Sequence, residues 1–211
     1  FTSEELAEIH KNYTSARKSI DDKYAALAAI SFLLNHNSID YFFSGGTCLG
    51  IYRDRALIPW DDDIDIDIKD SSYIEMEKLV VEYARNNSFP YWIGANKFHP
   101  KIGLYINNIK VSLVKQTKGL IKRDYLYRAK YRVPVDYVFP AYNVKFKDYN
   151  VRLPKDPVAY LNHLYGSSWN KVIRWPAEEN DEFYDTSYRR IGKFYDLMNS
   201  FQFFLSRFTI N

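Results

Sequence analysis

The chain has 211 residues, 46% of them hydrophobic and 26% charged, which is enough for one globular domain with its own hydrophobic core. Its 29 basic and 26 acidic residues give a net charge of only +3, which fits an anionic substrate but does not indicate a nucleic-acid-binding protein, for which a strongly basic stripe is expected. The single cysteine, Cys48, excludes an intrachain disulfide and a cysteine-rich zinc site, and it favours a reducing, cytoplasmic location.

A membrane-spanning segment is not predicted. The sequence has no run of about 18 apolar residues, and no signal peptide is recognisable at its start. An apolar stretch over residues 197–208 indicates the end of a terminal helix. We expect this helix either to dock on the core or to make a peripheral contact at the inner membrane surface.

Helical spacing dominates the first part of the chain. Thr2 and Glu5 fit a capping box, and apolar residues then recur at helical intervals from Leu6 to Leu34. This pattern predicts one or two helices over residues 3–35, with a possible break at 12–15.

A glycine corner is predicted next. Residues 41–44 read as a buried strand, Gly45-Gly46 as a tight turn, and Thr47 to Arg53 as a short helix. Glycines allow close backbone approach, and the start of a helix presents N–H groups and a positive dipole end to an anion. The segment is therefore typical of a phosphate-binding corner.

An alternating acidic segment follows the corner and predicts a strand from Asp61 to Ile68. In a strand, alternate side chains share one face, so the acids lie opposite the isoleucines. A row of carboxylates repels itself and favours a bound cation, for which hard oxygen ligands indicate Mg²⁺ or Mn²⁺. A calcium loop is excluded because its glycine and closing glutamate are missing. The acids of the shared face are Asp61, Asp63, Asp65 and Asp67.

Helices and hairpins make up the remainder. A helix is expected from Ser71, as N-cap, to about Asn86, and another from residues 156–157 to Gly166. The basic, tyrosine-rich stretch 116–133 is either a mobile loop over the site or a solvated surface segment. Strands are expected at 90–94, 101–106 and 109–115, with a turn at Asn107-Asn108, then at 142–146 and 151–153, and a terminal helix at about 186–208.

Two of these segments together resemble the signature of the LicD family. They are residues 44–53, SGGTCLGIYR, and residues 58–66, IPWDDDIDI, which match in order and in spacing. The resemblance covers about residues 25–176. Weaker landmarks lie downstream, at Phe139-Pro140, Leu153-Pro154, Tyr160-Leu161 and Tyr165-Gly166.

Members of this family are nucleotidyltransferase-fold enzymes that move phosphocholine or a related phospho-group from a CDP-activated donor to a glycan, and the fukutin-related proteins are relatives. The resemblance implies an α+β fold: a mixed sheet flanked by helices, with helical N- and C-terminal segments. We expect a single domain over residues 1–211 with its core at about 25–176. The implied partners are a CDP-linked donor and a glycan or lipid-linked glycan acceptor.

The resemblance also assigns site residues. Asp63 and Asp65 match the paired acids and are expected to bind the metal ion and to be catalytic. The residues expected to bind the donor phosphates are Gly45, Gly46, Thr47 and Arg53, with Lys101 and Arg55 as further candidates from their position and charge. Asp61 is expected to orient the turn, and Trp60 to pack under the strand or stack on the base.

One position departs from the family pattern. A third acid is expected on the neighbouring strand, 109–114, where the sequence has Ser112. Serine is a poor Mg²⁺ ligand and a poor base, so Asp67 or Asp136 is the candidate replacement. The alternatives left open are a nucleotidyltransferase that leaves a nucleoside monophosphate on its target, and a non-catalytic nucleotide-binding module.

Overall fold

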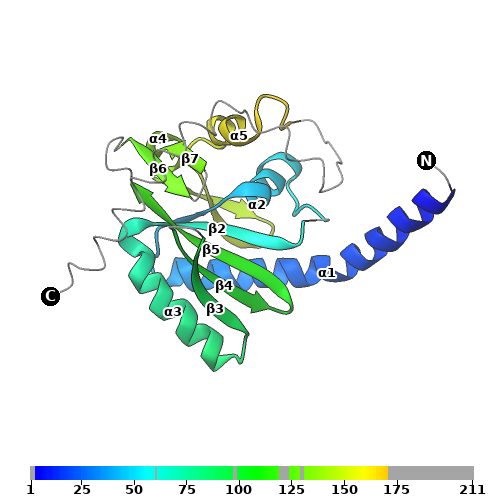
Figure 1. Ribbon diagram of the computed structural model, residues 1–211, viewed down its shortest axis with the longest axis horizontal. Helices are drawn as coiled ribbons and strands as arrows, with labels where there is room; N and C mark the ends of the chain where they lie inside the picture. The colour runs from blue at the N-terminus through cyan, green and yellow to red at the C-terminus, as the bar shows by residue number, and fades with distance from the viewer. Residues whose placement is uncertain (1–2, 60, 97–98, 119–123, 129–130, 171–211) are drawn as a thin grey trace.

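The structure is a computed structural model that describes residues 3–59, 61–96, 99–118, 124–128 and 131–170. Its fold is α+β, with a mixed sheet flanked by helices, as expected (Figure 1). In the view of Figure 1, α2 and α5 lie above β2, and α1 and α3 lie below it. The helices longer than one turn are α1 (Ser3–His36), α2 (Gly45–Leu49), α3 (Tyr73–Asn86) and α5 (Pro157–Tyr165).

The main sheet has seven strands, and its central path is β1-β2-β5-β4-β3. Strand β2 pairs in parallel with β5, whereas the other neighbours on this path are antiparallel, so the sheet is mixed. β6 and β7 continue the sheet from the end of β5, and β8 pairs only with β9. The strands are β1 (Tyr41–Phe43), β2 (Asp63–Lys69), β3 (Tyr91–Asn96), β4 (His99–Ile106), β5 (Ile109–Lys118), β6 (Tyr125–Arg128), β7 (Tyr131–Pro134), β8 (Tyr142–Phe146) and β9 (Tyr149–Leu153).

The alternation of β2 places its three isoleucines on one face of the strand, where they join the core. A second part of the core lies on the opposite face, where Phe42, the partner of Asp67, packs against Phe139 and Tyr160. Ile64, Ile66 and Ile68 are fully buried, and the acids take the opposite face. Apolar side chains from α1, α3 and β5 complete the same cluster, including Leu27, Ile30, Met76, Val80, Val111 and Leu113. Burial of this apolar area fixes the face of the sheet toward which Asp63 and Asp65 point.

Several boundaries differ from those predicted. α1 is one continuous helix, so the break expected at 12–15 is absent. The glycines do not form a separate turn: Gly45, with φ of +55°, is already the first residue of α2, which runs into the π-helix η1 (Gly50–Asp54). β2 starts at Asp63, which leaves Asp61 in the preceding connection.

The N-cap predicted for α3 is also wrong. A 3₁₀ turn, η2 (Asp70–Ser72), comes first, and Ser72 precedes the α-helix without a side-chain cap. Its hydroxyl instead accepts a hydrogen bond from the backbone N–H of Asp40, at 3.2 Å. A tertiary contact has therefore displaced the local capping pattern.

The basic stretch 116–133 is not a loop in its described part. β5 continues to Lys118, and β6 and β7 pair antiparallel with each other. Leu126 and Val133 are 3% and 6% exposed, so the stretch carries apolar anchors between its charges. The terminal helix predicted at 186–208 lies outside the described residues.

The hairpin turn between β4 and β5 and the N-cap of α5 were predicted correctly. Asn107 and Asn108 have φ of +51° and +65°, as a type I′ hairpin turn requires. Asp156 caps α5 by accepting a hydrogen bond from the N–H of Ala159 at 2.9 Å, and Gly166 ends that helix. α4 (Val135–Val138) is a single turn that packs against α5.

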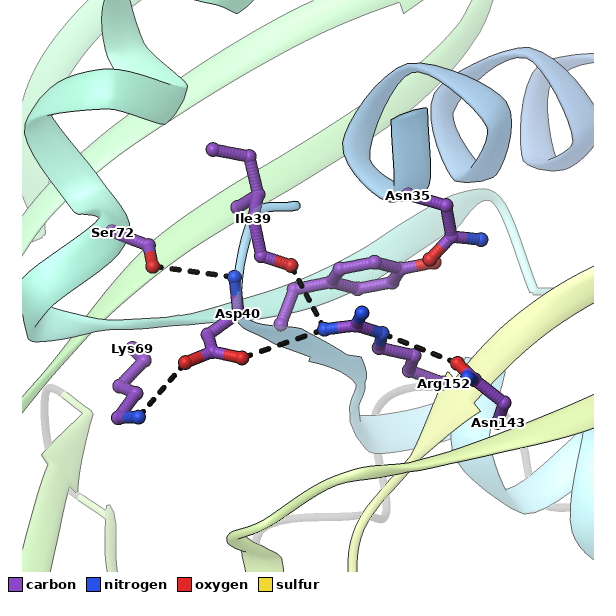
Figure 2. Close-up of polar contacts among 8 residues, drawn as sticks. Asn35, Ile39, Asp40, Lys69, Ser72, Asn143 and Arg152 are labelled. Carbon is purple, nitrogen blue, oxygen red and sulfur yellow. Dashed lines mark hydrogen bonds and ion pairs between the residues drawn. The ribbon is translucent and has the colours of Figure 1, made fainter. Parts of the chain in front are cut away.

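A polar cluster around Asp40 ties the β8–β9 hairpin to the main sheet (Figure 2). The Asp40 carboxylate lies 2.8 Å from Nζ of Lys69 and 3.5 Å from Nη1 of Arg152. The same Arg152 nitrogen donates to the carbonyl of Ile39 at 3.1 Å. One arginine of β9 thereby holds the segment that leads into β1.

Candidate active site

The glycine corner lies directly against the acidic strand. A Cβ atom added to Gly46 would stand 2.5 Å from Oδ2 of Asp61, and one added to Gly45 would stand 2.9 Å from Oδ2 of Asp65. Real side chains do not tolerate such distances, and Gly45 also has a positive φ. Only glycines at these positions let the start of α2 approach the two carboxylates this closely.

Hydrogen bonds hold the corner in place. The N–H of Ser44 donates to the carbonyl of Asp65, and the N–H of Asp65 donates to Oγ1 of Thr47, both at 3.0 Å. The N–H of Gly45 donates to the hydroxyl of Tyr160 at 3.2 Å. The Thr47 side chain and the Gly45 N–H thus have partners inside the protein.

Carboxylates converge beside this corner. One oxygen from each of Asp61, Asp62 and Asp63 lies within 4.8 Å of the others, and Asp65 follows Asp63 on the same strand face. Burial raises the pKa of Asp61 to about 6, opposed by Lys23 and assisted by the neighbouring acids. Burial and the charge of Asp65 likewise raise the pKa of Asp63. The cluster therefore carries excess negative charge in a partly buried place.

Two lysines face this charge. Nζ of Lys110, on β5, lies 3.1 Å from Oδ2 of Asp63. Lys23, on α1, is 1% exposed and donates to the carbonyl of Ile58 at 3.0 Å and to that of Asp61. Burial lowers the pKa of Lys23, and the acids of the cluster oppose that shift.

The position of the third acid is as predicted. Ser112 is the Cα partner of Asp65 across the parallel β2–β5 pair. It is fully buried, and among the described residues its Oγ has no hydrogen-bond partner. A buried hydroxyl without a partner is uncommon, so this side chain is a mismatch in its surroundings.

Neither candidate replacement acid occupies that position. Asp67 is 2% exposed and accepts hydrogen bonds from Oγ of Ser44 at 3.1 Å and Nε2 of Gln116 at 2.5 Å. Asp136 is an exposed residue of α4. The acids whose oxygens group with that of Asp63 are Asp61 and Asp62, and Asp61 faces Gly46 as Asp65 faces Gly45.

Two basic residues predicted for phosphate binding have protein partners. Arg53 forms an ion pair with Asp54 at 2.7 Å and donates to the carbonyl of Trp169 at 3.1 Å. Lys101 shares the sheet face of Ser112, and its Nζ lies 5.4 Å from the ring centroid of Trp92. Arg55 is exposed and has a positive φ. Trp60 lies outside the described residues.

Cys48 is packed in the core, as expected. It is fully buried, and this burial raises the pKa of its thiol. The contacts of Lys23 and Tyr160 with the site, by contrast, were not predicted from the sequence, although Tyr160-Leu161 is a landmark of the family resemblance. Each sits in an ordinary helical pattern, and neither has a local signal for its long-range contact.

The fold and the site define a nucleotidyltransferase-like domain: a helix that starts at a glycine pair faces an Asp-Ile-Asp strand in a mixed sheet. The family model described as "LicD/FKTN/FKRP, nucleotidyltransferase domain" matches residues 38–156. This is more than half of the chain, and the chain belongs to that family.

Similar proteins agree with this assignment. An uncharacterised protein of Rickettsia prowazekii is 27% identical over 164 residues, covering 76% of this chain and 60% of the relative. The ribitol-5-phosphate transferase FKTN of Homo sapiens is 23% identical over 181 residues, covering 71% of this chain and 37% of the relative. The chain thus spans 60% or less of the length of these curated relatives.

One solved structure is similar over most of its length. The crystal structure of ANT(2″)-Ia in complex with adenylyl-2″-tobramycin superposes with a TM-score of 0.44 at 14% identity, covering 84% of this chain and 93% of that one.

No helix among the described residues has both the length and the apolar composition to cross a bilayer.

Proposed function

We propose that this domain transfers a phospho-linked group from a CDP-activated donor to a hydroxyl of a glycan or lipid-linked glycan, with CMP as the leaving group. Family membership supports transfer of this kind, and one relative is named as a ribitol-5-phosphate transferase. The observation that carries the proposal is the contact of the glycine corner with Asp61 and Asp65. A diphosphate seated on α2 would lie beside the carboxylates that hold its metal ion.

Mg²⁺ or Mn²⁺ is the proposed cofactor, with Asp63 and Asp65 as its ligands and Asp61 beside them. The residues fit such an ion: all the donors are carboxylate oxygens, and burial, assisted by the neighbouring acids, raises the pKa values of Asp61 and Asp63. When bound, the ion would polarise the phosphoryl oxygens and offset negative charge that develops during transfer.

The remaining residues bind and orient the donor. The first turn of a helix leaves its N–H groups without intrahelical partners, so we assign those of Gly46 and Thr47 to phosphate oxygens. The N–H of Gly45 is used by Tyr160 and positions the corner. Arg53 and Lys101 are the proposed cations for the diphosphate and the departing CMP. A cytoplasmic location, at or near a membrane surface, belongs to the same proposal.

Product analysis tests the proposed reaction. The protein is incubated with Mn²⁺, a glycan acceptor and CDP-linked alcohols, choline and ribitol among them, labelled in the base or in the transferred group. Release of base-labelled CMP with the other label on the acceptor is expected. Base label on the acceptor would instead indicate nucleotidyl transfer.

The buried, unpartnered Ser112 favours one rival, a non-catalytic module that binds CDP-ligands. Calorimetry with CDP and Mg²⁺ separates it from an enzyme, since binding without turnover of any donor in the panel would favour the module.

Asp63→Asn and Asp65→Asn test the paired acids. Each change removes a metal ligand and a repelling charge, so we expect turnover to fall about a hundredfold or more, with thermal stability equal to or above that of the wild type. Asp148→Asn, at an exposed acid of the turn between β8 and β9, is a matched change of charge away from the cluster. Wild-type turnover in both variants at low metal concentration would contradict the assignment.

A further inference from the structure

We propose that Lys23 and Tyr24 of α1 are positioning residues of the active site, although they lie outside the family-matched segment 38–156. Together they form what we call the α1 clamp, which holds residues 57–61 so that Asp61 faces the glycine corner. The inference rests on the proposed function, because it concerns the same metal-binding carboxylates.

The clamp acts on main-chain atoms. Nζ of Lys23 donates to the carbonyl of Ile58 at 3.0 Å and to the carbonyl of Asp61. The hydroxyl of Tyr24 accepts a hydrogen bond from the N–H of Leu57 at 3.1 Å. Two successive helical residues therefore hold both ends of a connection whose described residues, 57–59 and 61, lie in no strand or helix.

The burial of Lys23 argues for a built contact. An ammonium group that is 1% exposed costs desolvation energy unless its protons are bonded. The Lys23 ammonium donates to two backbone carbonyls, so this lysine holds the main chain in place and also puts a positive charge near the acids. Its stem adds to the apolar packing of α1.

The position that the clamp fixes is a tight one. Oδ2 of Asp61 lies where a Cβ on Gly46 would be only 2.5 Å away, so the connection and α2 meet without spare room. A shift of the connection moves Asp61 relative to Asp63 and Asp65. Mutation of residues that orient metal ligands through hydrogen bonds typically lowers metal affinity about tenfold to a hundredfold.

Replacing Lys23 by methionine has two opposing effects on metal binding. Loss of a positive charge near the carboxylates strengthens the attraction for a cation, whereas loss of the two hydrogen bonds frees residues 57–61. We expect the loss of the two hydrogen bonds to outweigh the loss of the positive charge, so that metal affinity falls. The sign of the change in affinity therefore separates a positioning residue from a mere counter-charge.

The test measures Mn²⁺ binding by electron paramagnetic resonance, without nucleotide, on the folded full chain. We expect Lys23→Met to weaken binding about tenfold or more, Lys23→Arg to recover part of the loss, and Tyr24→Phe to weaken binding in the same direction but less. Lys155→Met, which removes the charge of an exposed lysine, should leave binding unchanged.

Unchanged or tighter Mn²⁺ binding in Lys23→Met would overturn the proposal. If Lys23→Met does not fold, Tyr24→Phe decides, because it keeps the ring contact with Phe146 and removes only the hydroxyl. Absence of Mn²⁺ binding in the wild type would instead refute the metal site of the proposed function. Thermal unfolding of each variant checks that affinity is compared between folded proteins.

Discussion

Asp61 shows how its surroundings change the behaviour of a single residue. Burial raises its pKa from 3.8 to about 6, and nearby acids push in the same direction. Between these values the folded protein holds a proton that the unfolded chain releases. The free energy of unfolding therefore falls as the pH rises through this window, and stability is lost above it.

Asp61→Asn removes this titration. In EDTA, we expect its free energy of unfolding, relative to the wild type, to increase by about 2 kcal/mol between pH 4 and pH 7. Urea unfolding at several pH values measures the difference. Asp62→Asn, at an exposed neighbouring position, should shift by less than about 0.5 kcal/mol. Equal slopes for the two variants would contradict a buried Asp61.

The placement of the paired acids, the glycines and Ser112 beside one another was predictable from short sequence segments and the family resemblance. Alternation with isoleucine predicts which face Asp63 and Asp65 occupy, and burial of Ile64 and Ile66 confirms it. The partners of Arg53 were not predictable in this way. The backbone carbonyl of Trp169 stands 116 residues away in the sequence, and no pattern near the arginine points to it.

Among the secondary-structure elements, the features predicted correctly include two that are set by local residues. The Asn107-Asn108 turn and the Asp156 cap depend on the residues themselves, and both were predicted. The stretch 116–133 was misread because its many charges mask buried Leu126 and Val133. The cap expected at Ser71 was wrong, because a 3₁₀ turn covers Asp70–Ser72 and the hydroxyl of Ser72 accepts a tertiary hydrogen bond from Asp40, which local propensity does not reveal.

The contact between α2 and the connection before β2 yields a prediction for Gly46→Ala. The added methyl would meet Oδ2 of Asp61 at 2.5 Å, so the carboxylate must move. Misplacement of a reacting group by about 1 Å can cost roughly a hundredfold in rate, and we expect a turnover loss of about that size. Steady-state kinetics at saturating Mn²⁺ measures it.

Gly94→Ala is the matched control for this substitution. Its methyl would meet the Trp92 ring at 3.2 Å, a side chain that can shift, and Gly94 has an ordinary φ. We expect less than a twofold change in turnover. Equal losses in the two variants would show that Gly46 acts through general destabilisation and not through Asp61.

For the molecule as a whole, contacts between distant segments decide how the parts are joined, and these were the least predictable. Lys23 reaches residues 35 and 38 positions away, and Arg152 reaches Asp40 and Ile39 over more than a hundred. Helical periodicity placed Lys23 on α1, but the sheet must be assembled before its partner is known. The mixed α+β fold was predicted, whereas the hydrogen bonds between its distant segments were not.

Arg152→Met tests the link between the β8–β9 hairpin and the main sheet (Figure 2). Loss of the bonds to Ile39 and Asp40 should lower the free energy of unfolding by about 1–2 kcal/mol. Urea unfolding measures this, and hydrogen exchange should show faster opening of the hairpin. Lys145→Met, whose ammonium bonds only within the hairpin turn, should have little effect. Equal stability of the two variants would contradict the link.

The alternation of β2 constrains how this protein can evolve. Ile64, Ile66 and Ile68 are fully buried while their neighbours are acidic, so a single inserted or deleted residue within the strand would exchange the two sets. The carboxylates of Asp63 and Asp65 would then enter the core, and isoleucines would take their face of the strand. Single substitutions are therefore tolerated in β2 more readily than a change in the number of its residues.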